Sequence, residues 1–244
     1  MLKLIFFLAI SMSLYADWDP TCLKTASPHV SLDVLHKRDF IDLKKKVFVE
    51  LNKSWCSAEK ANLIMDVIAA TKPSVCVEVG VFTGSSLLPV VTTLSYLHHG
   101  HAYGIDTWSN IEAVRGLDQQ DPNYEWWSTV NMDEVVLKYL TTMSTWQLLP
   151  HLTTIYSPSK VAVEQFEAID FLNLDGNFSE NGSTEDAQLY LPKVKKGGYI
   201  LLSNAFQTSA ENHLTKMKAL SIIVEQCEIV AEIENSNTIL FQKQ

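Results

Sequence analysis

Apolar positions recur in this sequence at helical spacing in some segments and as short continuous runs in others. The helical spacing predicts helices over residues 39–51, 58–71, 85–97, 132–143, 161–166, 183–191 and 210–223. Short runs rich in β-branched residues predict seven strands, the first from residue 75 and the others at 102–105, 152–156, 169–174, 199–202, 228–233 and 238–242. Strands and helices therefore alternate through most of the chain.

This alternation is typical of an α/β protein with a doubly wound, mostly parallel seven-stranded sheet. A short turn at Asn235 and Ser236 separates the last two strands, which predicts a C-terminal antiparallel hairpin. We expect an N-terminal arm and helix over residues 17–57 and one domain over residues 58–244. Residues 109–150 are too long for a plain loop and predict a lid-like insertion, whose tryptophans either line a pocket or anchor the core.

Residues 1–16 differ in character from the rest of the chain. One early lysine, Lys3, precedes an apolar run from Leu4 to Ile10, and the small residue Ala16 ends the segment. This order is typical of a secretory signal peptide and predicts export to the periplasm or the medium, with no stable membrane span after processing. A cytoplasmic protein that retains the segment is the alternative.

Composition narrows the choice of partners. The 244 residues are 47% hydrophobic, which is enough for one sizeable core, and the formal net charge is −9. Nucleic acid attracts basic surfaces, so this acidic balance argues against nucleic acid as the main partner. A small-molecule partner fits better, and the composition leaves a homodimer open.

The stretch of residues 74–86, S-V-C-V-E-V-G-V-F-T-G-S-S, joins the first strand to a glycine loop and the start of a helix. Gly80 and Gly84 permit the tight turn and the close backbone approach that a ligand cradle needs. The helix that follows points free amides at the same place. Glu78 is an acid within an apolar strand, where its carboxylate needs a partner. The stretch predicts a binding site for a ligand with a cationic amine.

The spacing of this loop argues against two common nucleotide cradles. A dinucleotide fingerprint needs G-x-G-x-x-G, whereas the loop reads E-x-G-x-x-x-G from Glu78 to Gly84. The sequence has no G-x-x-x-x-G-K motif, and no Lys or Arg adjoins the loop to neutralise a phosphate. A nicotinamide-dependent oxidoreductase is therefore a weak alternative.

Polar side chains follow several of the predicted strands. Asp106 ends the second strand, where α/β nucleotide-binding folds hold ribose hydroxyls. The carboxyl ends of parallel strands meet at one edge of a sheet, so these side chains should converge on one crevice. The converging set is Glu78, Gly80, Asp106, Ser159, Asp175, Asn177, Ser203 and Asn204.

Four blocks of the sequence resemble the class I S-adenosylmethionine-dependent methyltransferases, most of all the small-molecule O-methyltransferase branch with a catechol-type or macrocin-type core. They are V-E-V-G-V-F-T-G-S-S (77–86), Y-G-I-D-T-W (103–108), I-D-F-L-N-L-D-G-N (169–177) and Y-L-P-K-V-K-K-G-G-Y-I-L-L-S-N (190–204). With their order and spacing, they cover about residues 58–244. The resemblance implies a Rossmann-like methyltransferase fold, S-adenosylmethionine as cofactor and O-methylation of a small hydroxylated acceptor. A catalytically silent S-adenosylmethionine-binding protein is the alternative.

The resemblance also implies roles for individual residues. Glu78 and Gly80, with Gly84 in the same loop, would hold the methionine part of the cofactor. Ser85 or Ser86 would bind its carboxylate. The ribose would bind Asp106, and the adenine would contact Thr107 or Trp108 and Ser159. Asp175 would lie beside the sulfonium and the acceptor.

The predicted catalytic end departs from the family pattern. Metal-dependent relatives carry carboxylates at the ends of the fourth and fifth strands. This sequence keeps Asp175 and Asn204, the predicted catalytic residues and candidate metal ligands, but Ser203 replaces the second carboxylate. One carboxylate, one amide and one hydroxyl make a poor Mg²⁺ site. The catalytic Lys or His after the fourth-strand acid is also missing, since Asn177 and Phe178 stand there. Magnesium stays an alternative.

Overall fold

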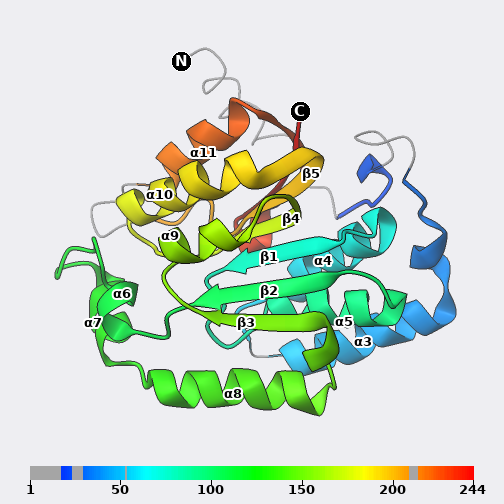
Figure 1. Ribbon diagram of the computed structural model, residues 1–244, viewed down its shortest axis with the longest axis horizontal. Helices are drawn as coiled ribbons and strands as arrows, with labels where there is room; N and C mark the ends of the chain where they lie inside the picture. The colour runs from blue at the N-terminus through cyan, green and yellow to red at the C-terminus, as the bar shows by residue number, and fades with distance from the viewer. Residues whose placement is uncertain (1–17, 24–29, 53, 209–213) are drawn as a thin grey trace.

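The computed structural model describes residues 18–23, 30–52, 54–208 and 214–244. The proposed signal peptide lies outside these ranges. A seven-stranded sheet forms the centre of the molecule, with helices on both faces (Figure 1). Its strands are β1 (Val75–Val79), β2 (His101–Asp106), β3 (Leu152–Tyr156), β4 (Ile169–Leu174), β5 (Val194–Leu202), β6 (Cys227–Ile233) and β7 (Thr238–Lys243).

The strand order is β3-β2-β1-β4-β5-β7-β6. Strands β1 to β5 pair in parallel, whereas β7 runs antiparallel to both β5 and β6. The chain moves outward from β1 to β3 and then returns to place β4 on the other side of β1. The carboxyl ends of β1 and β4 therefore form a topological switch point, where such sheets bind ligands. The predicted doubly wound sheet and terminal hairpin are confirmed.

Two apolar layers enclose the sheet. One contains α3 (Arg38–Leu51), α4 (Ala58–Thr71), α5 (Leu87–Leu97) and α8 (Met132–Thr145), and the other contains α9 (Ser159–Ala162), α10 (Glu180–Tyr190) and α11 (Met217–Val224). Figure 1 shows α9, α10 and α11 together on the upper side of the sheet. Strands β1 and β4 contribute alternate side chains to both layers, which explains their continuous apolar runs.

The structure corrects four predicted helical segments and one strand. Helix α10 begins at Glu180 rather than at 183, because Ser179 accepts a hydrogen bond from Gly182 N and caps it. Only the four residues of α9 and a 3₁₀ turn form where a helix over 161–166 was expected. Helix α11 begins at Met217, and residues 209–213 lie outside the described chain. Helix α5 begins two residues late, and β5 begins early, at Val194.

One lysine of α3, Lys44, is largely buried, whereas its neighbours Lys45 and Lys46 are exposed. Lys44 forms an ion pair with Asp66 on α4, and its side chain is only 12% exposed. Trp18 Nε1 also donates a hydrogen bond to Asp66, at 2.9 Å. This cluster fixes the N-terminal arm and α3 on the central domain.

Residues 109–150 begin with two short helices, α6 (Asn110–Ala113) and α7 (Pro122–Thr129). Asn110 Nδ2 donates hydrogen bonds to the carbonyls of Trp127 and Val130, which closes this part of the chain on itself. Figure 1 places α6 and α7 beyond the arrowheads of β1 and β2. The first part of the insertion therefore lies at the carboxyl edge of the sheet, whereas α8 packs in the apolar layer, and the role as a lid stays a prediction.

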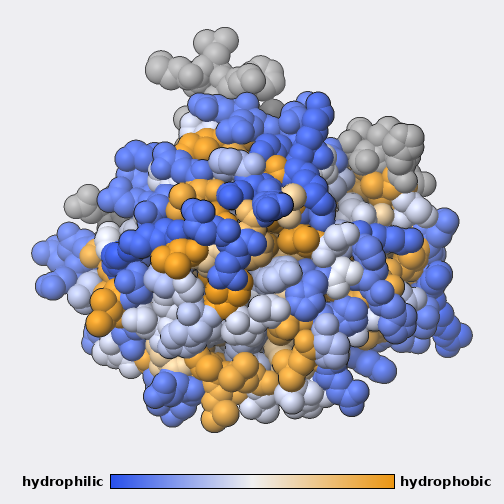
Figure 2. Space-filling view, viewed as in Figure 1, coloured by the Kyte–Doolittle hydropathy of each residue, from blue (hydrophilic) through white to orange (hydrophobic). Residues whose placement is uncertain are grey.

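The surface seen in Figure 2 is largely hydrophilic, with apolar side chains scattered over it and one group at its lower edge over α8. Leu137 and Leu140 on this helix are 65% and 44% exposed. Exposed leucines are common on folded domains. The homodimer stays a prediction. Within the described residues, no helix combines the length and apolar content needed to cross a lipid bilayer.

Candidate active site

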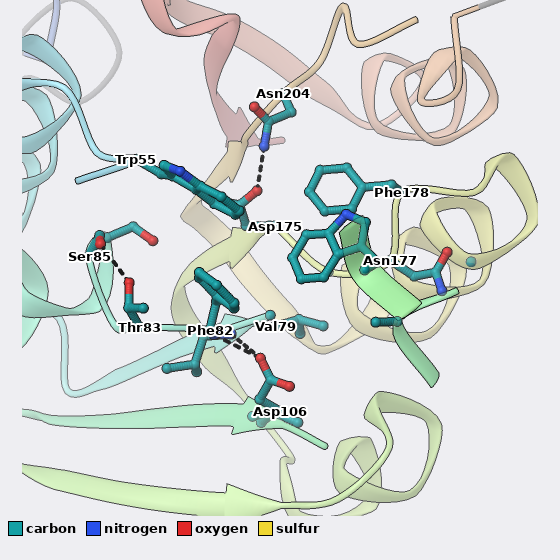
Figure 3. Close-up of a pocket in the computed structure, with 18 of the residues that line it drawn as sticks. Trp55, Val79, Phe82, Thr83, Ser85, Asp106, Asp175, Asn177, Phe178 and Asn204 are labelled. Carbon is teal, nitrogen blue, oxygen red and sulfur yellow. Dashed lines mark hydrogen bonds between the residues drawn. The ribbon is translucent and has the colours of Figure 1, made fainter. Parts of the chain in front are cut away.

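A cavity of about 770 Å³ lies at the carboxyl edge of the sheet, over the switch point between β1 and β4. Its walls come from the glycine loop after β1, the ends of β2, β4 and β5, the start of α4, and the insertion. Figure 3 shows Asp106, Asp175 and Asn204 around this space, with Trp55 and Phe82 beside them. Most of the polar residues predicted from the strand ends are thus brought together.

Gly80 forms the floor of the cavity at the switch point. Its φ is +85°, and a Cβ there would lie 2.4 Å from the carbonyl oxygen of Asp175. Only glycine permits this backbone conformation together with such close approach. The amides of Gly80 and Asp175 donate to the carbonyls of Ile105 and Val79, each at 2.9 Å. The cradle is therefore held by the sheet itself.

Asp106 organises the glycine loop. Its Oδ2 accepts hydrogen bonds from the amides of Val81 and Phe82, at 2.9 and 2.8 Å. Its Oδ1 accepts from the amide of Trp108 at 2.8 Å. Phe82 and Trp108 both have positive φ, 51° and 42°, which non-glycine residues adopt only when their surroundings hold them there. The carboxylate supplies that restraint while it lines the cavity.

Two residues predicted to contact the cofactor lie behind the loop rather than in the cavity. Trp108 is buried, stacks on Tyr139 and donates its Nε1–H to the carbonyl of Phe82 at 2.8 Å. At Gly84, an added Cβ would lie 2.6 Å from a ring carbon of Tyr139. Both residues shape the loop against α8, whereas Thr107 lines the cavity.

Glu78 also lies beneath the loop, with 1% of its surface exposed. Its Oε1 accepts from Ser86 Oγ at 2.8 Å, and its Oε2 accepts from Asn173 Nδ2 at 3.0 Å. Burial raises the pKa of this carboxyl to about 7, against the lowering effect of these two hydrogen bonds. The buried Glu78 carboxyl, which was expected to need a partner, therefore has two neutral ones, Ser86 and Asn173.

Glu78→Gln is expected to flatten the dependence of stability on pH. Because burial raises the pKa of Glu78 in the folded state, its stabilising contribution is complete below the unfolded value, 4.5, and is lost as pH rises through about 7. The amide can keep both contacts, since the Ser86 hydroxyl can also accept a hydrogen bond. From about pH 5 to about pH 8, the unfolding free energy of the variant minus that of wild type should rise by about 3 kcal/mol. Urea unfolding at both pH values measures the two unfolding free energies. An equal change with pH in the variant and in wild type would contradict the expectation.

Asp175, at the end of β4, carries two hydrogen-bond partners. Its Oδ1 accepts from Asn204 Nδ2 at 2.8 Å, and its Oδ2 forms an ion pair with Lys60 Nζ at 3.1 Å (Figure 3 shows the Asn204 contact). Burial would raise the pKa of this carboxyl, but Lys60 and Lys216 outweigh it, so the pKa lies below its ordinary value. Asp175 is therefore an anion at neutral pH.

Lys60 is a site residue that sequence reasoning missed. It lies in the first turn of α4, is 4% exposed and lines the cavity. One signal was available, because Lys60 stands four residues before Ile64 and so falls on the buried stripe of the helix. The identity of its partner, 115 positions away, could come only from the fold.

The residues around Asp175 do not fit a divalent ion. Both carboxylate oxygens are engaged, one of them by a cation, and Asn204 turns its amide donor toward Asp175. The Ser203 side chain points elsewhere and donates to Asn173 Oδ1 at 3.0 Å. Across the described ranges, no group of three or more His, Cys, Asp or Glu residues could hold a metal. A single carboxylate bound to an ammonium lacks the oxygen ligands that Mg²⁺ requires.

The expectation that Ser203 faces the crevice is wrong. Ser203 is fully buried and does not line the cavity, because its hydroxyl extends the chain of hydrogen bonds from Glu78 through Asn173. The main chain turns at the end of β5, and Asn204 alone reaches Asp175 from there. The position that carries a second carboxylate in metal-dependent relatives is occupied here by a structural hydroxyl.

Ser203→Asp should destabilise the protein without creating a magnesium site. The new carboxylate would face Asn173 Oδ1 and lie close to Glu78, so about 3 kcal/mol of unfolding free energy should be lost. Ser203→Ala is the matched control and removes one buried hydrogen bond, worth about 1 kcal/mol. Calorimetric titration with MgCl₂ and thermal unfolding measure both effects. Stoichiometric Mg²⁺ binding by Ser203→Asp would contradict the expectation.

Three serines, Ser85, Ser86 and Ser159, belong to the polar lining. Ser159 Oγ donates to Asp186 Oδ1 at 2.5 Å, and both residues line the cavity. Burial raises the pKa of Asp186 to about 6, although the Ser159 hydrogen bond and the charge of Lys216 oppose the shift. Ser85 and Ser86, before the first turn of α5, also line the cavity.

Five aromatic side chains form the outer wall, which we call the aromatic wall. Trp55 stacks on Phe82 with ring centroids 4.7 Å apart. Trp55 is 62% exposed although it lines the cavity, so it stands at the rim. The aromatic wall consists of Trp55, Phe82, Trp126, Trp127 and Phe178. Trp126 and Trp127 line the cavity, but Trp127 also belongs to the buried core and Trp146 packs against that core, so both roles considered for the insertion's tryptophans occur.

A doubly wound sheet with a glycine cradle and an acid at the switch point defines an α/β cofactor-binding protein. The chain belongs to a methyltransferase family, because the family described as "Methyltransferase domain" matches residues 77–205, more than half of its length. The predicted methyltransferase resemblance is confirmed at this level. No curated protein matches the sequence.

Solved structures share the fold at low sequence identity. The S-adenosylhomocysteine-bound methyltransferase PaMTH1 of Podospora anserina aligns with a TM-score of 0.55 and 12% identity, covering 91% of this chain and 92% of its own. The O-methyltransferase NovP aligns with a TM-score of 0.57 and 15% identity, and the alignment covers 77% of this chain and 81% of NovP. The O-methyltransferase TomG of Streptomyces achromogenes, in complex with S-adenosylmethionine, aligns with a TM-score of 0.55 and 10% identity. The alignment covers 93% of this chain and 97% of TomG.

Proposed function

We propose that this protein transfers a methyl group from S-adenosylmethionine to a hydroxyl of a small acceptor bound in the cavity. The observation that carries the proposal is the placement of Gly80, Asp106 and Asp175 around one cavity in a chain of the methyltransferase family. The similarity of the fold to O-methyltransferases crystallised with S-adenosylmethionine or S-adenosylhomocysteine supports it.

The polar end of the cavity fits the cofactor. Gly80 lines the cavity and lets the loop pack closely on the backbone of Asp175, and the Asp106 carboxylate is an acceptor suited to ribose hydroxyls. Thr107 and Ser159 would contact the adenine, and Ser85 and Ser86 the cofactor's carboxylate. Glu78, Gly84 and Trp108 would act through the shape of the loop, since none of them lines the cavity.

When bound, S-adenosylmethionine supplies a methyl group on a positively charged sulfur that is already a good leaving group. The protein's main contribution is then to hold the acceptor oxygen in line with that methyl group. Asp175 lines the cavity together with the polar residues and the aromatic wall, and Asn204 binds it, which supports this role for Asp175. The predicted catalytic pair is therefore a positioning pair in this proposal.

The aromatic wall favours a flat acceptor. Rings pack well against aromatic side chains in offset or edge-on arrangements. A phenolic hydroxyl on such a ring could point at Asp175, because the wall adjoins it (Figure 3). Phenols are accordingly preferred over sugars as acceptors.

Calorimetry with S-adenosylhomocysteine, followed by incubation with labelled S-adenosylmethionine and panels of phenols and sugars, tests the proposal. We expect micromolar binding and transfer to at least one phenol. Binding without transfer to any acceptor, with and without Mg²⁺, would favour the catalytically silent alternative. Absence of cofactor binding would overturn both.

We also propose that residues 1–16 direct export and that residues 58–244 form the methyltransferase domain. The order of charged, apolar and small residues in the first segment supports export. The N-terminal sequence of the protein purified from its natural host tests it, since removal of residues 1–16 is expected.

A further inference from the structure

We propose that Lys60 takes the place of the divalent cation in this active site and holds the acceptor oxygen beside Asp175. The inference rests on the proposed function and names the group that would bind the reacting hydroxyl. Its starting point is the misfit between this site and a metal. The pair of Lys60 and Asp175 occupies the end of β4, where Asp175 was predicted to be a metal ligand.

The position of Lys60 is unfavourable for a lysine that serves only stability. It lies in the first turn of α4, where the helix dipole repels cations, and its amide is the one that Ser57 caps. It is also buried, and burial of a charged group carries a large desolvation penalty. Replacing such a pair with apolar residues is often neutral or stabilising. A role in binding explains why the charge is placed here.

The ammonium has donors to spare. A lysine ammonium carries three N–H groups, and the described part of the chain gives Nζ of Lys60 one acceptor, Asp175 Oδ2. Lys60 and Asp175 both line the cavity, together with Phe82 of the aromatic wall. An acceptor oxygen at this point can receive a hydrogen bond from Lys60 while its ring packs on the wall.

The charges around Lys60 keep it protonated. Burial would lower the pKa of the ammonium, but Asp175, Cys56 and Glu78 outweigh it, so the pKa lies above its ordinary value. Lys216 is a second buried lysine nearby, and burial lowers its pKa; its Nζ donates to the Ser203 carbonyl at 2.7 Å, and it does not line the cavity. Lys60 is therefore a fixed cation and not a base.

A fixed cation that contacts the oxygen favours the ionised form of a phenol, and the opposing effect of the Asp175 carboxylate is reduced because Lys60 and Asn204 already bind it. The acceptor hydroxyl releases its proton to solvent water through the cavity mouth, and Lys60 stabilises the oxygen anion that remains. That oxygen forms a bond to the methyl carbon, while the bond between this carbon and sulfur breaks and leaves its electron pair on the sulfur. Charge is balanced without a metal, since the anion and the sulfonium neutralise each other.

The test follows the ionisation of para-nitrophenol, whose phenolate absorbs visible light, on the full chain saturated with S-adenosylhomocysteine. Wild type should lower the apparent pKa of the bound phenol, and Lys60→Arg should keep much of that effect. Lys60→Gln, which retains a hydrogen-bond donor without the charge, should lose it. Lys44→Gln is the matched control, because it removes a similarly buried lysine from its ion pair with Asp66, outside the cavity.

Methyl transfer provides the second readout. Lys60→Gln should lower kcat for a phenol by about 100-fold, as loss of one donor to an oxyanion does, and should shift the pH profile to higher pH. Wild-type activity should be insensitive to EDTA and to added Mg²⁺. Normal binding of S-adenosylhomocysteine and thermal unfolding would show that Lys60→Gln is folded.

Three outcomes would overturn the inference. They are an unshifted phenol pKa on wild type, an equal shift on Lys60→Gln, and loss of wild-type transfer in EDTA. Failure of the proposed function looks different, since wild type would then bind no S-adenosylhomocysteine or transfer no methyl group. The ionisation of the phenol is measured without turnover, which keeps the two questions separate.

Discussion

Asp175→Asn is expected to lower the free energy of unfolding by about 3–5 kcal/mol, the range for breaking a buried ion pair by removing one partner. The substitution keeps the size of the side chain and a contact with Asn204, but it leaves the ammonium of Lys60 buried without its counter-ion. Asp42→Asn is the matched control. It breaks the exposed pair with Lys45 on α3 and should change stability by less than about 1 kcal/mol.

The pH dependence of Asp175→Asn identifies the cause of the loss. Without Asp175, burial should lower the pKa of Lys60 below its unfolded value, so the folded state would bind fewer protons than the unfolded chain. Stability of the variant should then rise with pH up to about 10, the unfolded pKa of lysine. The double variant Lys60→Met/Asp175→Asn should be more stable than Asp175→Asn alone. Urea titrations of wild type, Asp175→Asn, Lys60→Met and the double variant measure this cycle, and additive losses would contradict the ion-pair account.

Asp106→Ala should weaken binding of S-adenosylhomocysteine at least about 100-fold, since three hydrogen bonds from backbone amides to a charged group are lost. Those bonds hold Phe82 and Trp108 at positive φ, so the glycine loop should relax away from its binding shape. The same substitution removes the acceptor proposed for the ribose. Calorimetric titration measures the affinity, and thermal unfolding shows whether the domain remains folded.

The control for Asp106→Ala is Asp118→Ala. Asp118 also accepts a hydrogen bond from a backbone amide, that of Gln120 at 2.8 Å, but it is exposed and does not line the cavity. Asp118→Ala should leave the affinity for S-adenosylhomocysteine unchanged. Equal affinities for Asp106→Ala and wild type would show that neither the loop geometry nor this carboxylate contributes to binding.

Much of the fold was predictable because its determinants are local. Helix α4 and the N-cap Ser57 were placed within the correct residues, since apolar spacing and capping act over a few positions. The strands were found because parallel strands covered on both faces read as continuous apolar runs. Helix α11 was misplaced, and its predicted start lay partly in residues 209–213, outside the described chain.

The cavity was predictable only in outline. The order of strands and helices implied a switch point, which correctly brought Gly80, Asp106, Asp175 and Asn204 to one place. The direction of each side chain was not implied. Ser203 and Asn204 are neighbours in sequence, yet the turn after β5 sends one into the core and the other to Asp175.

By itself, the sequence determined the alternating α/β architecture, the family and the residues that end the strands, because periodicity, turns and motifs are encoded over short distances. Only the tertiary structure decided which charged side chains meet at the ends of the strands. Glu78 binds Ser86 and Asn173 rather than lining the cavity, and Asp175 pairs with Lys60, which lies 115 positions earlier in the sequence. Electrostatic pairing depends on distance in space and on burial, and neither is visible in the spacing of residues along the chain.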